Sequence, residues 1–249
     1  MKKLFYDLET TGLEPNKNGI HQISGCIEIN GKDEEWFNFK VRPFHTDLID
    51  EKALETSHVT KEQIMDYQTA EEIHSRFLNL LGKYVNKFDK KDKFFLIGYN
   101  NTKFDDPFLR AWFGKLNDKF YGSWFWPQSI DVMPLATNHL IFQRPDMENF
   151  KLMTVSKQFG LEVDESKLHD ALYDIELTRN VYRKIEYSNA FPENKDKEIP
   201  RELTNKESEL LTDYLLNDNN LSIYEYYQLK NKLDNEWIDN EMWSKHYRM

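Results

Sequence analysis

The sequence has little cysteine and no long apolar run, and each shortage excludes a class of protein. Cys26 is the only cysteine among 249 residues, which excludes an internal disulfide framework and a multi-cysteine zinc site. A reducing, cytoplasmic location is therefore expected. The start, MKKLFYDLE, meets an acid at Asp7 before a signal-peptide core can form, and no later run approaches the length of a membrane span. We expect no membrane association.

Positive charge is also in deficit. Lysine and arginine total 33 against 43 aspartates and glutamates, so the formal net charge is -10. An acidic chain is poorly suited to coat a nucleic-acid duplex along its length. A protein that grips only a few nucleotides at one end avoids this objection, because bound divalent cations reverse the sign of the potential where the phosphate lies. The acidity therefore excludes broad phosphate binding but leaves nucleic acid open as a partner.

Apolar residues recur with the periods of both strands and helices. The strands are expected at residues 3–9, 20–29, 36–41 and 94–99, with Asn30-Gly31 as a hairpin turn. Helical spacing is found within residues 51–85 and near residues 107–117, 131–140, 150–159 and 170–187. Strands at the start with helices interleaved later are typical of a mixed α/β sheet.

A segment rich in proline, asparagine and charge follows this pattern and marks a boundary. Beyond it, two capping-box patterns precede apolar-periodic segments, which favours short helices. The sequence thus predicts a domain over residues 1–187, a linker over residues 188–203 and a helical extension over residues 204–249. The extension is a candidate surface for a protein partner or for self-association.

The first expected strand carries two acids. Because side chains alternate along a strand, Asp7 and Glu9 point to the same face. Their Cα atoms are expected roughly 6.6 Å apart, close enough for both carboxylates to reach one cation. The alternative is an exposed edge strand on which both acids are simply solvated. Directly after them, Thr10-Thr11-Gly12-Leu13 forms a tight polar turn that can present backbone N–H groups and hydroxyls to a phosphate or sugar.

A second acidic site follows the buried strand at 94–99. Asp106 precedes Pro107 and is expected to be the N-cap of a helix, a structural role. Asp105 has no such explanation. It is either a turn residue or a functional acid at the carboxyl end of a strand, where open α/β sheets place their ligands.

A third site lies at the start of the last helix of the domain. The helical rows place Asp174 toward the buried side, where a carboxylate is costly unless it is paired or bound to metal. His169 precedes the first turn and is suited to proton transfer near neutral pH. Taken alone, His169 can equally be a solvated loop histidine.

Together these three segments resemble the motifs of the DnaQ-like DEDDh family of exonucleases, which includes polymerase proofreading subunits, oligoribonuclease and ribonuclease T. The resemblance covers residues 1–187 in the right order, and the segment GYNNTKFDD is similar to the second motif of bacterial exonuclease I. It implies an RNase H-like fold, with a mixed five-stranded sheet flanked by helices. It also implies a 3′-to-5′ exonuclease that acts on single-stranded ends and releases nucleoside 5′-monophosphates, with DNA favoured and with DNA repair or replication as its setting.

The resemblance further implies the roles of individual residues. Two divalent cations, Mg²⁺ or Mn²⁺, are held by the four acids, while His169 takes a proton from the attacking water. The expected catalytic residues are Asp7, Glu9, Asp105, His169 and Asp174. The terminal nucleotide is expected to contact Thr10, Thr11, Gly12, Leu13, Asn101 and Phe104. For Phe104, packing in the core is the competing interpretation.

Three other interpretations stay open at the level of the sequence. The chain can be an exoribonuclease of the same family, or a nucleic-acid-binding module that kept the fold but lost the reaction, or a structural protein whose acids are solvated. The aromatic segment Trp124-Phe125-Trp126 is either a platform for stacking bases or part of the core.

Overall fold

The computed structural model describes residues 1–167 and 170–190. The chain divides into two units, Met1–Ile185 and Glu186–Met249, and the description below concerns the first. The last helix of this unit, α8 (Ala171–Ala190), runs three residues into the segment predicted as a linker. The rest of that segment, the extension predicted over residues 204–249 and the candidate residue His169 lie outside the described residues.

Five strands form one mixed sheet in the order β3-β2-β1-β4-β5, as the family resemblance implies. The long strands β1 (Lys2–Thr10), β2 (Ile20–Ile29) and β3 (Lys32–Lys40) pair antiparallel in sequence order. The short strands β4 (Phe95–Gly98) and β5 (Ile130–Asp131) continue the sheet in parallel from β1. The carboxyl ends of β1 and β4 therefore lie side by side.

The predicted hairpin between β2 and β3 is confirmed. Asn30 and Gly31 have φ angles of 51° and 84°, the left-handed region that a tight two-residue hairpin turn requires at both positions. Asparagine and glycine adopt this region most readily, so the dipeptide sets the register of the two strands.

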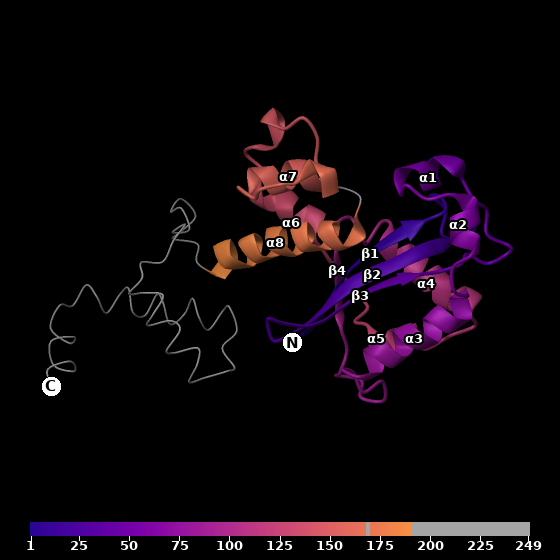
Figure 1. Ribbon diagram of the computed structural model, residues 1–249. Helices are drawn as coiled ribbons and strands as arrows, with labels where there is room; N and C mark the ends of the chain where they lie inside the picture. The colour runs from indigo at the N-terminus through magenta and orange to yellow at the C-terminus, as the bar shows by residue number, and fades with distance from the viewer. Residues whose placement is uncertain (168–169, 191–249) are drawn as a thin grey trace, which may run out of the picture. The chain divides into compact units, whose positions relative to one another are not determined.

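One face of the sheet packs against the helices α3 (Ala70–Gly82), α4 (Asp105–Lys115) and α5 (Tyr121–Trp124) (Figure 1). The shorter helices α1 (Glu51–Thr56) and α2 (Lys61–Met65) precede them. The predicted helical region 51–85 is thus three helices. Side chains with less than 5% exposure fill this core, among them Leu4, Tyr6, Leu8, Ile23, Ile27, Ile73, Phe77 and Trp112.

The other face packs against α6 (Val132–His139), α7 (Leu152–Gln158) and α8 (Figure 1). Short 3₁₀ turns at Arg144–Asp146 and Glu165–Lys167 lie in the connections between them. The core here contains Phe5, Cys26, Ile97, Val132, Val155, Ile175, Val181 and Ile185. None of the helices in the described part of the chain combines the length and the hydropathy of a membrane span.

Two expectations from the sequence need correction or completion. The helix α4 begins at Asp105, its N-cap position is Phe104, and no side chain caps it, so the prediction that Asp106 is an N-cap is wrong. Asp106 instead accepts hydrogen bonds inside the protein from the Tyr6 hydroxyl and the Asn101 amide. The open question at residues 124–126 is answered for Trp124 and Phe125, which are buried in the core.

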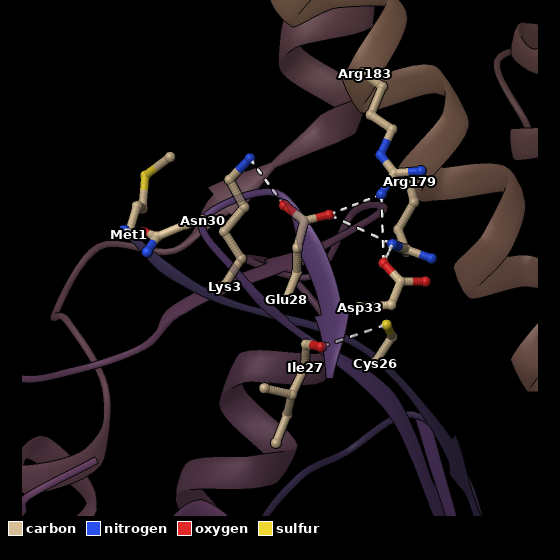
Figure 2. A network of polar contacts seen from close by, with 9 residues as sticks. All are labelled: Met1, Lys3, Cys26, Ile27, Glu28, Asn30, Asp33, Arg179 and Arg183. Carbon is tan, nitrogen blue, oxygen red and sulfur yellow. Dashed lines mark hydrogen bonds and ion pairs between the residues drawn. The ribbon is translucent and has the colours of Figure 1, made fainter. Parts of the chain in front are cut away.

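A buried ion-pair cluster joins α8 to the sheet, and Figure 2 shows it from close by. Glu28 on β2 is 2% exposed and pairs with Arg183 at 2.9 Å, Lys3 at 3.3 Å and Arg179 at 3.4 Å. Asp33 on β3 also pairs with Arg179 and Arg183. Three cationic side chains pair with two carboxylates in this cluster, which fixes the middle of α8 over β2.

Candidate active site

Two acids stand near the carboxyl end of β1. Asp7 and Glu9 follow Phe5 at steps of two, so all three side chains lie on one face of the strand. Phe5 packs with residues of α8 in the core, which shows that this face looks toward α8. Both carboxylates are half-buried.

Asp105 reaches the same edge from the neighbouring strand. The loop after β4 leads into α4, and the first residue of that helix is Asp105, which is 5% exposed. The backbone N–H of Leu8 donates to its Oδ1 at 3.1 Å. This bond places the Asp105 carboxylate against β1 between the positions of Asp7 and Glu9.

Asp174 approaches from α8. It is half-buried in the first turn of that helix, and its charge acts on Asp7. The predicted proton acceptor His169 lies outside the described residues, so its relation to these acids stays a prediction.

Like charges meet at Asp7. Its pKa is raised well above the ordinary value, first because burial removes water from the charged form and then because Asp105, Glu9 and Asp174 oppose ionisation. The pKa of Asp105 is raised to about 8, chiefly by burial, although the N–H of Leu8 favours its charged form. Acids from three separate segments therefore act on one another at the end of β1. We call Asp7, Glu9, Asp105 and Asp174 the acidic edge.

Ser57 and Lys40 are neighbours of Glu9 that sequence reasoning missed. The Ser57 hydroxyl, at the end of α1, donates to Glu9 Oε2 at 2.6 Å. Lys40 lies at the end of β3. Burial lowers its pKa, while the negative charges of Glu9 and Asp170 act in the opposite direction. No local pattern marks either residue, because each meets Glu9 only through the packing of the sheet.

The turn after β1 is held by its own side chains. The Thr10 hydroxyl donates to the Gly12 carbonyl at 2.8 Å, and the Thr11 hydroxyl donates to the Leu48 carbonyl at 2.7 Å. A Cβ on Gly12 would lie 2.3 Å from the Asn18 amide nitrogen, so only glycine fits there. Both threonine hydroxyl protons are therefore engaged in hydrogen bonds to backbone carbonyls.

Leu13 is the exposed member of the predicted nucleotide-binding set. Its side chain is 78% exposed at the tip of the turn, where an apolar group can meet a base. Asn101, by contrast, is fully buried and donates to Asp106 at 3.4 Å. Phe104 is half-buried, and its ring centroid lies 5.1 Å from that of Phe108 in the core.

The loop after β4 owes its shape to Asp131, another residue that the sequence did not single out. Its carboxylate, at the end of β5, accepts from the Asn100 backbone N–H at 2.9 Å and from the Thr102 hydroxyl at 2.6 Å. It also caps α6 through the N–H of Met133 at 3.0 Å. The only signal in the sequence is an acid between an apolar residue and a helix.

The acidic edge has the chemistry of a site for hard divalent cations. Carboxylate oxygens are the ligands that Mg²⁺ and Mn²⁺ prefer, and a cation relieves the repulsion that raises the pKa of Asp7. Within residues 1–167 and 170–190, no three Asp, Glu, His or Cys side chains are grouped as a ready-made metal-binding set. The donor types therefore fit, while coordination requires the carboxylates to turn toward a common point.

Comparison with known proteins gives a family match over most of the described chain. A family model described as RNase_T, Exonuclease, matches residues 4–182. The chain is similar to ribonuclease T of Buchnera aphidicola, with 27% identity over 191 residues that cover 72% of this chain and 81% of that protein. It is also similar to the PolC-type DNA polymerase III of Mycoplasmopsis pulmonis, with 25% identity over 71% of this chain but 11% of the polymerase.

Among solved structures, the chain is similar to E. coli exonuclease I. The complex of that enzyme with a dT13 oligonucleotide has a TM-score of 0.58 and 20% identity, and the match covers 78% of this chain and 42% of the enzyme. Its zinc-bound complex with single-stranded DNA has a TM-score of 0.59. The chain thus spans less than half of exonuclease I, and at this identity the likeness shows the fold alone.

Proposed function

The chain belongs to the exonuclease family whose RNase_T model spans residues 4–182, and from that premise we propose a specific activity. It is a 3′-to-5′ exonuclease that depends on divalent cations and hydrolyses phosphodiester bonds at the 3′ end of single-stranded nucleic acid. Its products are nucleoside 5′-monophosphates. DNA is the favoured substrate, and a role in DNA repair or replication and a cytoplasmic location stay predictions.

One observation carries this proposal. The pKa of Asp7 is raised by burial and by the charges of Asp105, Glu9 and Asp174, which come from β1, from the start of α4 and from α8. Repulsion that raises the pKa of a buried acid in this way costs the fold stability. Strongly shifted groups gathered at one edge of a sheet support a catalytic role.

All four acids would hold cations, and neighbouring donors would orient two of them. In our proposal, Asp7, Glu9 and Asp174 hold one Mg²⁺ or Mn²⁺, and Asp7 with Asp105 holds a second. Bound cations supply the Lewis acidity that phosphodiester hydrolysis requires. The Leu8 N–H and the Ser57 hydroxyl keep Asp105 and Glu9 oriented.

Other residues would act on the substrate itself. His169 accepts the proton of the attacking water, a role suited to a side chain that titrates near neutral pH. The exposed Leu13 packs against the terminal base, and the turn that Thr10, Thr11 and Gly12 build holds it in place.

A second candidate is supported by a specific comparison. The relative with 27% identity is named ribonuclease T, which favours RNA over DNA as the substrate of a related site. The acidic edge acts on the phosphodiester that both polymers share, so the same residues serve either activity. The recognition of a 2′-hydroxyl depends on contacts around the sugar.

The test is a digestion panel with 5′-labelled strands. Single-stranded DNA, duplex DNA and RNA of one sequence are incubated with the protein in Mg²⁺, in Mn²⁺ or in EDTA. We expect a ladder that shortens from the 3′ end of single strands, and no ladder in EDTA. The Asp7→Asn variant should lose at least about a thousandfold in rate, on the order of 4 kcal/mol in the barrier. Glu34→Gln, at an exposed acid on β3, is the matched control.

Three results would count against the proposal. If Asp7→Asn keeps full activity, the acidic edge takes no part in the reaction. If the ladder still forms in EDTA, the reaction does not depend on divalent cations. Binding of single strands without any cleavage by the unaltered protein identifies a nucleic-acid-binding module that has lost the reaction.

A further inference from the structure

An aromatic and basic patch lies at the end of the sheet opposite the acidic edge. It is built by the loop that leads into β4 and by the segment around α5. We call this surface the distal patch and define it by Lys87, Phe88, Lys90, Lys91, Lys119 and Phe120, all of which are exposed. Phe88 is 85% exposed and Phe120 is 65% exposed. In the described part of the chain, the only other exposed phenylalanine is Phe142.

Aromatic rings and lysines alternate in this patch. The ammonium nitrogen of Lys87 lies 5.4 Å from the centre of the Phe88 ring, 6.0 Å from that of Phe120 and 5.8 Å from that of Trp124. These contacts hold the two exposed rings beside a positive charge. The two apolar rings are thus exposed to solvent beside the ammonium group of Lys87. This arrangement suits a ligand that has flat bases and a negatively charged backbone.

The charge of the patch is opposite to that of the chain. The segment 86–93 contains four lysines and two aspartates, although the chain as a whole carries a net charge of -10. One of these acids, Asp92, forms an ion pair with Lys2 and accepts from the Asn86 N–H. Positive charge thus remains concentrated at the exposed loop, and its natural complement is a polyanion.

The patch is within reach of a strand whose 3′ end lies at the acidic edge. The ion pair with Asp92 fixes the loop beside Lys2 at the start of β1, while Glu9 lies seven residues further along that strand. At about 3.3 Å per residue, these positions are about 23 Å apart along β1. Lys2 and Glu9 point to opposite faces of the strand, so a bound strand would follow a longer path around the sheet. A stacked single strand with about 3.4 Å per nucleotide therefore needs more than about seven nucleotides to contact both surfaces.

We propose that the distal patch is a second binding surface for single-stranded nucleic acid, which holds the part of the substrate upstream of the 3′ end. Bases stack on Phe88 and Phe120, and phosphates contact the surrounding lysines. The substrate class rests on the proposed function, but binding at the patch does not require the reaction. A nucleic acid fits better than an acidic protein because every base offers a face to a ring, whatever the sequence.

The test compares a long and a short substrate. The double variant Phe88→Ala/Phe120→Ala removes only exposed rings, so the core stays intact, and the melting temperature checks this. For a dT20 strand we expect KM to rise at least about tenfold, since each lost base stack weakens binding severalfold or more. For dT3, which cannot reach the patch, KM should stay unchanged. Phe142→Ala, at a ring outside the patch that is as exposed as Phe88, at 88% against 85%, is the control.

A binding measurement separates this inference from the proposed function. Fluorescence anisotropy with labelled dT20 in EDTA needs no cleavage, and the double variant should bind at least about tenfold more weakly than the unaltered protein. Lys90→Gln/Lys91→Gln should also make binding less dependent on salt, whereas Lys32→Gln/Lys151→Gln should not. Equal binding of dT20 by the double variant and the unaltered protein overturns the distal patch, even if the enzyme is active. The same measurement with a labelled acidic peptide tests the alternative partner. If the double variant loses binding of the peptide but keeps binding of dT20, the proposal is overturned as well.

Discussion

The acidic edge and the ion-pair cluster around Glu28 lie on the same face of the sheet under the same helix, yet their charges are arranged in opposite ways. Around Glu28, two arginines and a lysine surround the buried carboxylate (Figure 2), and together they hold its pKa below the ordinary value although burial opposes this. At the acidic edge, further carboxylates surround Asp7, and its pKa is raised. One helix, α8, contributes Arg179 and Arg183 to the first region and Asp174 to the second.

This difference in charge arrangement distinguishes a cluster that stabilises the fold from a set of acids that serves the candidate site. A cluster in which every charge lies beside an opposite charge costs little as long as every partner is present, and it fixes the position of α8. An unbalanced set of acids destabilises the protein in the absence of cations. The ion-pair cluster around Glu28 therefore holds in place a helix whose first turn carries Asp174, an acid that repels Asp7. Each of the predictions below alters the charge of one buried group, either in one of the two regions or, for His21, outside both.

The largest effect on stability is expected from Glu28→Gln. The variant leaves Lys3 and Arg179 buried without the carboxylate that neutralises them, so unfolding should become easier by about 3 kcal/mol. Because the pKa of Glu28 is lowered in the folded protein, the stability that it contributes is present above its unfolded pKa and is lost as pH falls through the folded value. Urea denaturation at pH 7 measures the effect.

A surface ion pair is the control for this prediction. Glu35 pairs with Lys83 at 2.8 Å, and the Lys83 side chain is 57% exposed. Glu35→Gln should cost less than about 1 kcal/mol. Equal losses in the two variants would show that the cluster under α8 has no special role.

His21 offers a buried group that belongs to neither region. It is fully buried on β2, and among the described residues neither ring nitrogen has a hydrogen-bond partner. Burial, with help from Lys40, lowers its pKa to about 4. The unfolded chain therefore binds a proton more readily, and stability should fall between about pH 6.5 and pH 4 by up to about 3 kcal/mol.

His21→Leu should remove this part of the pH dependence. Denaturation curves at pH 7 and pH 4.5 measure the difference for both proteins, so that contributions from other groups cancel. If both lose the same stability on acidification, His21 is protonated without cost in the folded state.

A smaller effect of opposite sign is expected from Asp105→Asn in EDTA. The pKa of Asp105 is raised to about 8, so the unfolded chain binds fewer protons and stability should decline as pH rises between about pH 4 and pH 8. Asparagine keeps an oxygen for the Leu8 N–H but carries no charge. We expect the melting temperature at pH 8 to rise by about 5 °C, equivalent to roughly 2 kcal/mol, and a fall would mean that the acid is not under repulsion.

Local pattern was sufficient to predict four of the five strands and the acids that lie on them or directly after them, whereas the fifth strand was implied only by the family resemblance. Asp7 and Glu9 share a face because a strand has a period of two, and Asp105 follows a strand because the run before it is apolar. Asn30 and Gly31 predicted the hairpin through their tolerance of positive φ. These predictions depend only on the backbone and on neighbouring residues.

The errors and omissions involve contacts between distant segments. Asp106 has the sequence context of an N-cap, but the Tyr6 hydroxyl, 100 residues away along the chain, binds its carboxylate inside the protein. Asp131 and Ser57 support the site through hydrogen bonds to Thr102 and Glu9. No spacing rule identifies such partners, because they become neighbours only when the sheet and helices pack.

Cation-dependent stabilisation tests the central claim most directly. Mn²⁺ is titrated into the unaltered protein, into Asp7→Asn and into Glu28→Gln, and the melting temperature is followed. If the four acids form a cation site, Mn²⁺ should raise the melting temperature of the unaltered protein and of Glu28→Gln, each from its own starting value, and leave Asp7→Asn unchanged. An equal rise in all three proteins, or no rise in the unaltered one, would contradict the account.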